Sequence, residues 1–117
     1  MFEPLRQRIE QESQYLNGDI LKVDSFISHQ VEPALMDKCG QELANRFRDT
    51  QPTKILTVEI SGIAPALMTA KYLDIPVVYA RKHKPVMMPD TIYLTVASSP
   101  HSGRMVELIV SPEYLTP

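Results

Sequence analysis

The spacing of apolar residues divides the first half of the chain into two segments of helical period. From Pro33 to Arg48, apolar residues recur every three or four positions and polar residues fill the other face, which predicts an amphipathic helix. Residues 4–14 predict a shorter helix with Pro4 in its first turn. Asn17-Gly18-Asp19 ends it, and Ile20–Phe26 predicts a brief strand or an extended segment.

The centre of the chain has the pattern of a βαβ unit. Ile55–Ile60 is almost continuously apolar, which predicts a strand covered on both faces. Ser61-Gly62 ends this strand, Pro65 suits the first turn of a following helix, and Ile75–Ala80 is the next strand candidate. Residues 53–84 therefore predict two parallel strands joined by a right-handed helical crossover.

A second pair of strands is predicted near the carboxyl end. Ile92–Ala97 and Met105–Ser111 are joined by the polar segment Ser98–Arg104, so residues 91–111 predict an antiparallel hairpin with a long, mobile loop. With the helices before them, these elements predict an α/β fold in one domain spanning residues 1–117.

Composition and charge narrow the class of protein. The 117 residues are 44% hydrophobic with a net charge of −2, which describes an ordered domain. Charges of both signs are interspersed, so the chain has no broad cationic surface of the kind that binds nucleic acid. No apolar run approaches the roughly 18 residues of a membrane helix. One cysteine, Cys39, and no export signal predict a cytoplasmic protein. Three dispersed histidines do not suggest a metal site.

Two neighbouring segments carry candidate chemistry. In Glu59–Pro65 a strand ends and a helix begins, so backbone N–H groups, the helix dipole and the Ser61 hydroxyl favour an anion there. An ordinary strand-to-helix turn is the alternative. Arg81-Lys82-His83-Lys84 follows the next parallel strand and is expected at the same sheet edge, where its charges suit a phosphate or pyrophosphate. A solvated basic loop is the alternative there.

Three segments together resemble the xanthine phosphoribosyltransferases, a purine salvage branch of the type I phosphoribosyltransferases. Leu21–Phe26 with His29-Gln30 is similar to the family's amino-terminal signature, and residues 1–30 would be its base-recognition segment. Ile55–Pro65 resembles its first strand and pyrophosphate loop, and Pro76–Lys84 its second strand with the basic run. Each segment is weak evidence alone, but their order is specific.

The resemblance implies a homodimer that transfers the phosphoribosyl group of phosphoribosyl pyrophosphate (PRPP) to xanthine, with magnesium on the diphosphate. The products would be xanthosine monophosphate (XMP) and pyrophosphate. The purine would contact Leu21 and Ser28, with Ser28 standing where many relatives have Asn. Pyrophosphate would be held by Ser61, Gly62, Ile63, Arg81, Lys82 and Lys84, partly across the dimer interface. The hairpin loop resembles a flexible lid, and no catalytic residue is implied.

One motif of the type I family has no match in the chain. Its members carry a strand ending in two adjacent acidic residues that holds the ribose 5-phosphate, and they would reach it shortly after Tyr114–Pro117. The chain is therefore expected to be the amino-terminal part of a transferase and inactive alone. A non-catalytic relative that binds PRPP or a nucleotide is the alternative function.

Overall fold

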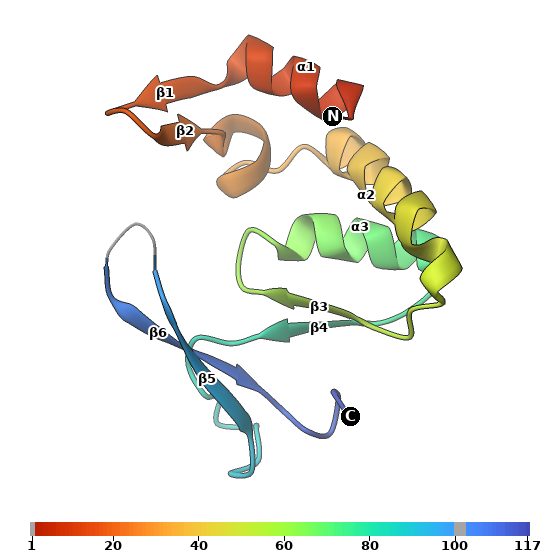
Figure 1. The fold of residues 1–117 in the computed structure, drawn as a ribbon, viewed down its shortest axis with the longest axis vertical. Coiled ribbons are helices and arrows are strands. Elements are labelled where there is room, and N and C mark those ends of the chain that lie inside the picture. Colours follow the sequence, from red (N-terminus) through yellow and green to blue (C-terminus); the bar gives the residue numbers. More distant parts are fainter. Residues whose placement is uncertain (1, 100–102) are drawn as a thin grey trace.

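The computed structural model describes residues 2–99 and 103–117 as an α/β fold of helices and three small sheets (Figure 1). The elements are α1 (Glu3–Glu12), β1 (Gln14–Leu16), β2 (Ile20–Lys22), a π-helical turn (Asp24–Ser28), α2 (Pro33–Phe47), a 3-10 turn (Arg48–Thr50), β3 (Ile55–Val58), α3 (Ile63–Leu73), β4 (Val77–Ala80), β5 (Tyr93–Ser98) and β6 (Met105–Val110). The expected helices at 4–14 and 33–48, the crossover helix and the four strands after residue 53 are all present.

The central βαβ unit has the predicted direction. β3 and β4 pair in parallel, with Ile55 opposite Val77 and Val58 opposite Ala80, and α3 connects them. β5 and β6 form the predicted antiparallel hairpin. A bridge between Arg81 and Ile109, with N–H···O distances of 2.8 Å in both directions, attaches this hairpin to the end of β4.

The amino-terminal segment differs from the expectation of a single brief strand. Asn17 and Gly18 have φ angles of 38° and 87°, and they turn the chain into a hairpin of β1 and β2. Because two consecutive positive φ angles suit a tight hairpin turn, Asn-Gly is well placed here. The following residues, Asp24–Ser28, form one π-helical turn that places the Phe26 side chain in full burial.

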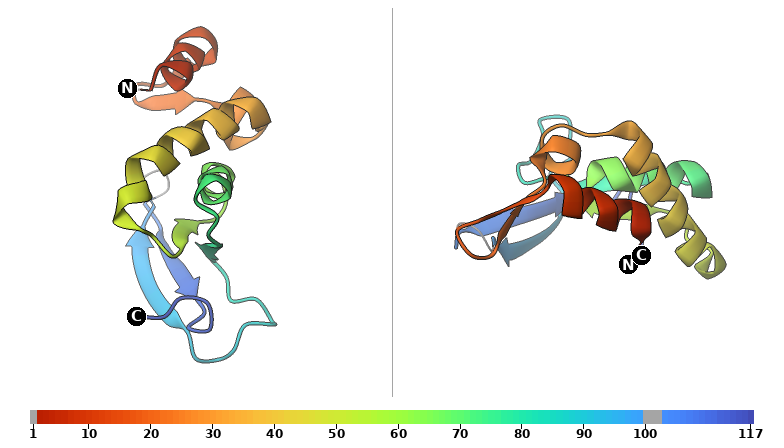
Figure 2. Two further views of the ribbon diagram at one scale, coloured as in Figure 1. Left: turned by 90° about the vertical axis from the view of Figure 1, so that its right-hand side faces the viewer. Right: turned by 90° about the horizontal axis from the view of Figure 1, so that it is seen from above.

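The hydrophobic core lies between the amino-terminal segment, α2 and α3 (Figure 2). Its buried centre consists of Phe26, Leu35, Met36 and Cys39. Gly40 marks the closest approach of the two helices, because a Cβ atom there would lie 2.4 Å from the Cβ of Met68 and 2.5 Å from its carbonyl carbon. The helix pair can therefore pack at this distance only with glycine at position 40.

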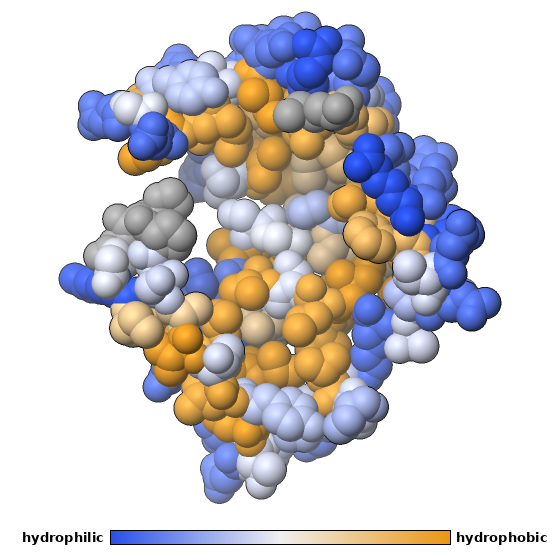
Figure 3. Space-filling view, viewed as in Figure 1, coloured by the Kyte–Doolittle hydropathy of each residue, from blue (hydrophilic) through white to orange (hydrophobic). Residues whose placement is uncertain are grey.

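The prediction that β3 is covered on both faces is wrong for the described part of the chain. α3 packs against one face, but Leu56 and Val58, on the other face, are 53% and 38% exposed. These side chains line an apolar groove of about 300 Å³ between β3, β4 and the β5–β6 hairpin. Figure 3 shows apolar residues gathered over this part of the molecule. No described helix is long and apolar enough to cross a membrane.

Candidate functional site

The turn from β3 into α3 presents several backbone N–H groups without partners. The Glu59 N–H donates to Ala80 O at 3.1 Å, and the Ile63 N–H donates to Ile60 O at 3.1 Å. The N–H groups of Ser61, Gly62 and Ala64 have no acceptor among the described residues. Because such groups lie at the positive end of a helix, they form a place where an anion is stabilised.

Gly62 has a steric role in this turn. Its φ of −69° is open to any residue, so backbone conformation does not require glycine. A Cβ atom at this position would lie 2.4 Å from Thr57 Oγ1 and 3.3 Å from Val58 O. The turn therefore folds tightly back onto β3. The peptide bond between Glu59 and Ile60, within the same turn, is cis.

Glu59 connects the turn to the basic run that follows β4. The Lys82 N–H donates to Glu59 Oε1 at 2.5 Å, and Arg81 Nε lies 3.3 Å from Glu59 Oε2. The hydrogen bond from Lys82 lowers the pKa of the Glu59 carboxyl below its usual 4.5, the charge of Arg81 adds to this, and desolvation opposes it. The carboxylate therefore stays ionised and holds the ends of two parallel strands together.

The cations of the basic run differ in whether a carboxylate already pairs with them. The Arg81 guanidinium is paired with Glu59 and lies 5.6 Å from the centre of the Tyr79 ring, and Lys84 Nζ lies 3.2 Å from Asp90 Oδ1. The Lys82 side chain is exposed and has no partner among the described residues. It is thus the cation of the run that is most readily available to a ligand.

These features together suit an anionic group such as a diphosphate. The parallel pairing of β3 and β4 brings Ser61, Gly62 and Ile63 to the same sheet edge as the basic run. Glu59 connects the two segments, because its carboxylate contacts both Arg81 and Lys82. Among the described residues, no group of three His, Cys, Asp or Glu side chains could hold a metal ion.

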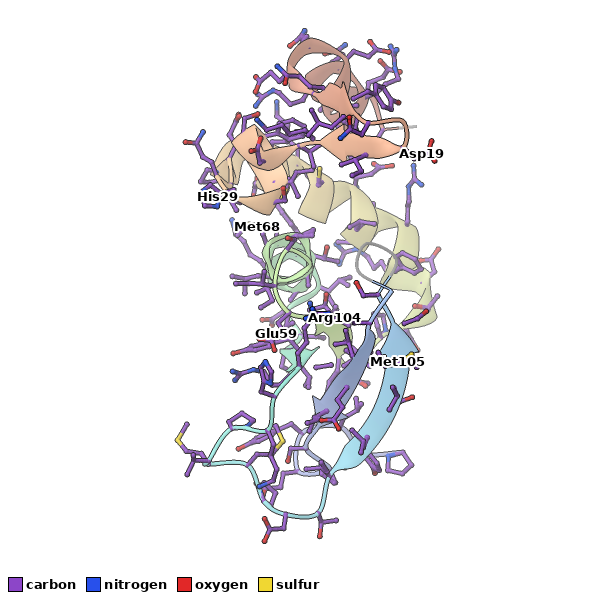
Figure 4. The ribbon with its side chains drawn as sticks, turned by 90° about the vertical axis from the view of Figure 1, so that its left-hand side faces the viewer. Asp19, His29, Glu59, Met68, Arg104 and Met105 are labelled. Atoms are coloured by element: carbon purple, nitrogen blue, oxygen red, sulfur yellow. The ribbon has the colours of Figure 1, made fainter. Side chains whose placement is uncertain are left out.

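Leu21 and Ser28, the residues expected to contact the purine, lie in a different part of the molecule. Leu21 is half-buried in β2 opposite Tyr15, whereas Ser28 is exposed at the end of the π-helical turn. Figure 4 shows His29, the neighbour of Ser28, on the same side of the molecule as Glu59, with Met68 between them.

The β5–β6 hairpin also reaches this side. Its described ends are joined by hydrogen bonds from Ser99 N–H to Arg104 O at 2.8 Å and from Gly103 N–H to Ser99 O at 3.0 Å. Arg104 and Met105 lie near the hairpin end in Figure 4. The centre of the loop expected to act as a lid, residues 100–102, lies outside the described residues.

Glu59 is the site residue whose part the sequence analysis did not identify. An acidic residue at the end of one parallel strand and a basic residue at the end of the next strand become neighbours only when the register of the sheet places them opposite each other. With Val58 opposite Ala80, Glu59 comes opposite Arg81. A search for opposite charges at matching ends of the predicted βαβ unit would have found the pair.

Solved structures define the class of fold. Adenine phosphoribosyltransferase from Trypanosoma brucei superposes on 93% of this chain and 49% of its own, with a TM-score of 0.64 and 20% identity. The enzyme from Giardia lamblia covers 91% and 57% at the same TM-score, with 17% identity. The chain therefore has a phosphoribosyltransferase fold over the part that it spans.

Sequence comparison leads to the particular family. The chain is 44% identical to xanthine phosphoribosyltransferase from Moorella thermoacetica over 115 residues, which are 98% of this chain and 59% of that protein. The Oceanobacillus iheyensis protein of the same name is 45% identical over 113 residues, and the Levilactobacillus brevis protein is 54% identical over 89. Over the length that it spans, the chain is therefore similar to the xanthine phosphoribosyltransferases, as the resemblance of its motifs implied.

The match extends over only part of these relatives. The chain spans 47–59% of the length of the three. No family model matches the chain.

Proposed function

We propose that the chain forms the pyrophosphate-binding and purine-recognising part of a phosphoribosyltransferase that acts on xanthine in purine salvage. The observation that carries this proposal is the pairing of the turn at Ser61-Gly62 with the basic run after β4, in a chain related to xanthine phosphoribosyltransferases. The comparisons do not favour the alternative of a non-catalytic regulatory relative.

In the proposed reaction, a ring nitrogen of the purine attacks the anomeric carbon of PRPP. The carbon–oxygen bond to pyrophosphate breaks, its electron pair leaves with pyrophosphate, and the proton of the attacking nitrogen passes to solvent. The N–H groups of Ser61, Gly62 and Ala64 and the Lys82 ammonium would stabilise the charge on the leaving group. Pro65, with no N–H group, adds no donor to this turn.

Other residues complete the proposed site. Ile63 belongs to the turn, while Arg81 and Lys84 would add charge after giving up their carboxylate partners in part. Leu21 and Ser28 would contact the base. Magnesium would bring its positive charge to the diphosphate. We assign no catalytic acid or base.

The proposed assembly is a homodimer in the cytoplasm. Cytoplasmic placement fits a chain with a single cysteine, which lies buried in the core.

Calorimetric titration with magnesium pyrophosphate tests the proposed site. The chain is expected to bind it, and Lys82→Ala to weaken binding about tenfold, because loss of one charge-assisted contact costs roughly 1.5 kcal/mol. Lys38→Ala is the matched control, since Lys38 is also exposed and unpartnered but lies on α2. No binding by the unmodified chain, or equal weakening by both variants, would contradict the site.

Turnover separates transfer from mere binding. The unmodified chain is mixed with PRPP and xanthine, and release of pyrophosphate is followed with and without the purine. Xanthine-dependent release supports the transferase and contradicts the expectation that the chain is inactive alone. Binding of PRPP without release fits both that expectation and the non-catalytic alternative. Guanine and hypoxanthine in place of xanthine test the choice of base.

A further inference from the structure

Three segments of the chain meet where β4 ends. Arg81, the residue after this strand, exchanges two main-chain hydrogen bonds with Ile109 of β6, each with an N···O distance of 2.8 Å. One residue earlier, Ala80 O accepts from the Glu59 N–H at the end of β3, at 3.1 Å. Ala80 and Ile109 are both buried. The main chain is thus fixed as far as Arg81, where the basic run begins.

Beyond Arg81, one hydrogen bond holds the main chain of the basic run. The Lys82 N–H donates to Glu59 Oε1 at 2.5 Å, and within the part of the chain that the structure describes no other main-chain group of residues 82–84 is hydrogen-bonded. A lysine ammonium is a point charge on a flexible stem, so its position depends on how firmly its main chain is held. The place of the Lys82 ammonium is therefore governed by Glu59.

The Glu59 carboxylate is itself held in place. Its side chain is 22% exposed, and Arg81 Nε lies 3.3 Å from Oε2. This nitrogen is buried and makes no hydrogen bond with a described residue, so charge and not a directed bond holds the ion pair. The bond from Lys82 lowers the pKa of the Glu59 carboxyl, and an ionised carboxylate is the stronger acceptor.

A carboxylate is unfavourable beside a bound anion if charge alone is considered. Glu59 lies two residues before Ser61, in the turn proposed to hold pyrophosphate. Its charge would repel the ligand. A carboxylate at this position therefore has to offset that repulsion, and its hold on Lys82 is the contact through which it can do so.

We propose that Glu59 is a positioning residue of the pyrophosphate site, whose carboxylate holds the Lys82 main chain so that the Lys82 ammonium stays beside the turn at Ser61-Gly62. Glu59 does not contact the ligand in this arrangement and acts through Lys82. The inference rests on the proposed function and adds the residue that arranges its charge before the ligand arrives. Such preorganisation lowers the cost of binding.

Calorimetric titration with magnesium pyrophosphate compares two neutral substitutions of Glu59. Glu59→Gln and Glu59→Ala both remove the charge, but only glutamine has an oxygen that can accept from the Lys82 N–H. Glu59→Ala is therefore expected to bind about tenfold more weakly than Glu59→Gln. Equal affinities of the two variants would overturn the proposal.

Glu113→Gln and Glu113→Ala are the matched controls. Glu113 is exposed, and its side chain has no partner in residues 2–99 and 103–117. Figure 1 shows the carboxyl end of the chain, to which this residue belongs, away from the turn between β3 and α3. The two controls should have the same affinity, and a tenfold difference between them as well would overturn the proposal.

A double-mutant cycle with Lys82→Ala separates positioning from a general effect on the fold. If Glu59 acts through the Lys82 side chain, Glu59→Ala should weaken binding by less than about twofold once Lys82 is alanine. The same tenfold weakening in both backgrounds would mean that Glu59 acts on the turn itself, and the proposal would be wrong.

Hydrogen exchange tests the contact without a ligand. The Lys82 amide should exchange at least about tenfold faster in Glu59→Ala than in Glu59→Gln, while the amides of α2 report whether the variants stay folded. Equal exchange of the Lys82 amide would overturn the proposal.

Glu59→Asp decides the question if Glu59→Ala does not fold. Its side chain keeps the charge but is one methylene shorter, so it should lose the contact with the Lys82 N–H. It is expected to bind magnesium pyrophosphate about tenfold more weakly than the unmodified chain, and an unchanged affinity would contradict the proposal.

These outcomes keep the two proposals apart. A chain that binds pyrophosphate through Lys82, with equal affinity for glutamine and alanine at position 59, contradicts this inference alone. An unmodified chain that does not bind pyrophosphate contradicts the proposed site and this inference together.

Discussion

Gly62→Ala is expected to damage the candidate site through a steric conflict inside the turn. The added methyl would lie 2.4 Å from Thr57 Oγ1, about 1 Å closer than ordinary contact, and 3.3 Å from Val58 O. Because Gly62 already has a right-handed φ, alanine adds no dihedral strain. The cost is therefore that of overpacking, about 1–3 kcal/mol.

A second substitution should relieve most of this conflict. Thr57→Ala removes the hydroxyl that the new methyl would meet, and Thr57 Oγ1 makes no hydrogen bond with a described residue. The double variant Thr57→Ala, Gly62→Ala should recover most of the lost stability, leaving only the tight contact with Val58 O. The coupling energy between the two positions is thus expected to be about 1 kcal/mol or more.

Thermal unfolding and pyrophosphate titration of the four proteins measure this cycle. Since 1 kcal/mol corresponds to roughly 4 °C for a chain of this size, Gly62→Ala should lower Tm by about 4–12 °C. It should also weaken pyrophosphate binding, and the double variant should restore both. An unchanged Tm for Gly62→Ala, or a double variant no better than the single one, would refute the steric reasoning.

Two further predictions concern the scaffold and the charge at the site. Gly40→Ala should destabilise the chain by about 2 kcal/mol despite a gain of about 1 kcal/mol in helix propensity, because the methyl group would meet the backbone of α3. Chemical denaturation measures this change, with Gln41→Ala on the exposed face of α2 as the control. A Gly40→Ala variant that is more stable than the unmodified chain would contradict the packing. Glu59→Gln should lower stability above pH 4.5. The difference in stability between the variant and the unmodified chain should shrink as the pH falls through the lowered pKa of Glu59, because protonation then removes the charge that attracts Arg81. A difference that is constant with pH would count against the ion pair.

Local patterns were sufficient to predict the elements that bury one face. α2 and the βαβ unit have clear helical and strand periods, and the structure confirms them. The amino-terminal hairpin escaped prediction because β1 and β2 have three residues each and lie largely exposed, so no alternation of burial marks them. Asn17-Gly18 was a usable signal for the hairpin, interpreted only as a break. The apolar run in β3 suggested two covered faces, but apolarity alone does not say what lies over each face.

The candidate site was predictable in position but not in its ion pairs. That Ser61-Gly62 and the basic run meet at one sheet edge followed from parallel pairing. The contacts of Arg81 with Glu59 and of Lys84 with Asp90 depend on strand register and loop shape, which a charge pattern does not specify. The binding roles stay predictions, both for Leu21 and Ser28 at the purine and for the residues assigned to pyrophosphate.

The close packing at Gly40 also determines how the two ends of a substrate would be aligned. The segment carrying Leu21 and Ser28 packs on α2, whereas the turn at Ser61-Gly62 leads directly into α3. The separation between the proposed positions of base and leaving group is therefore set by how closely these two helices approach. An enlarged side chain at position 40 would lengthen the distance between these two proposed positions, so the geometry of the proposed reaction would depend on a residue outside the candidate site.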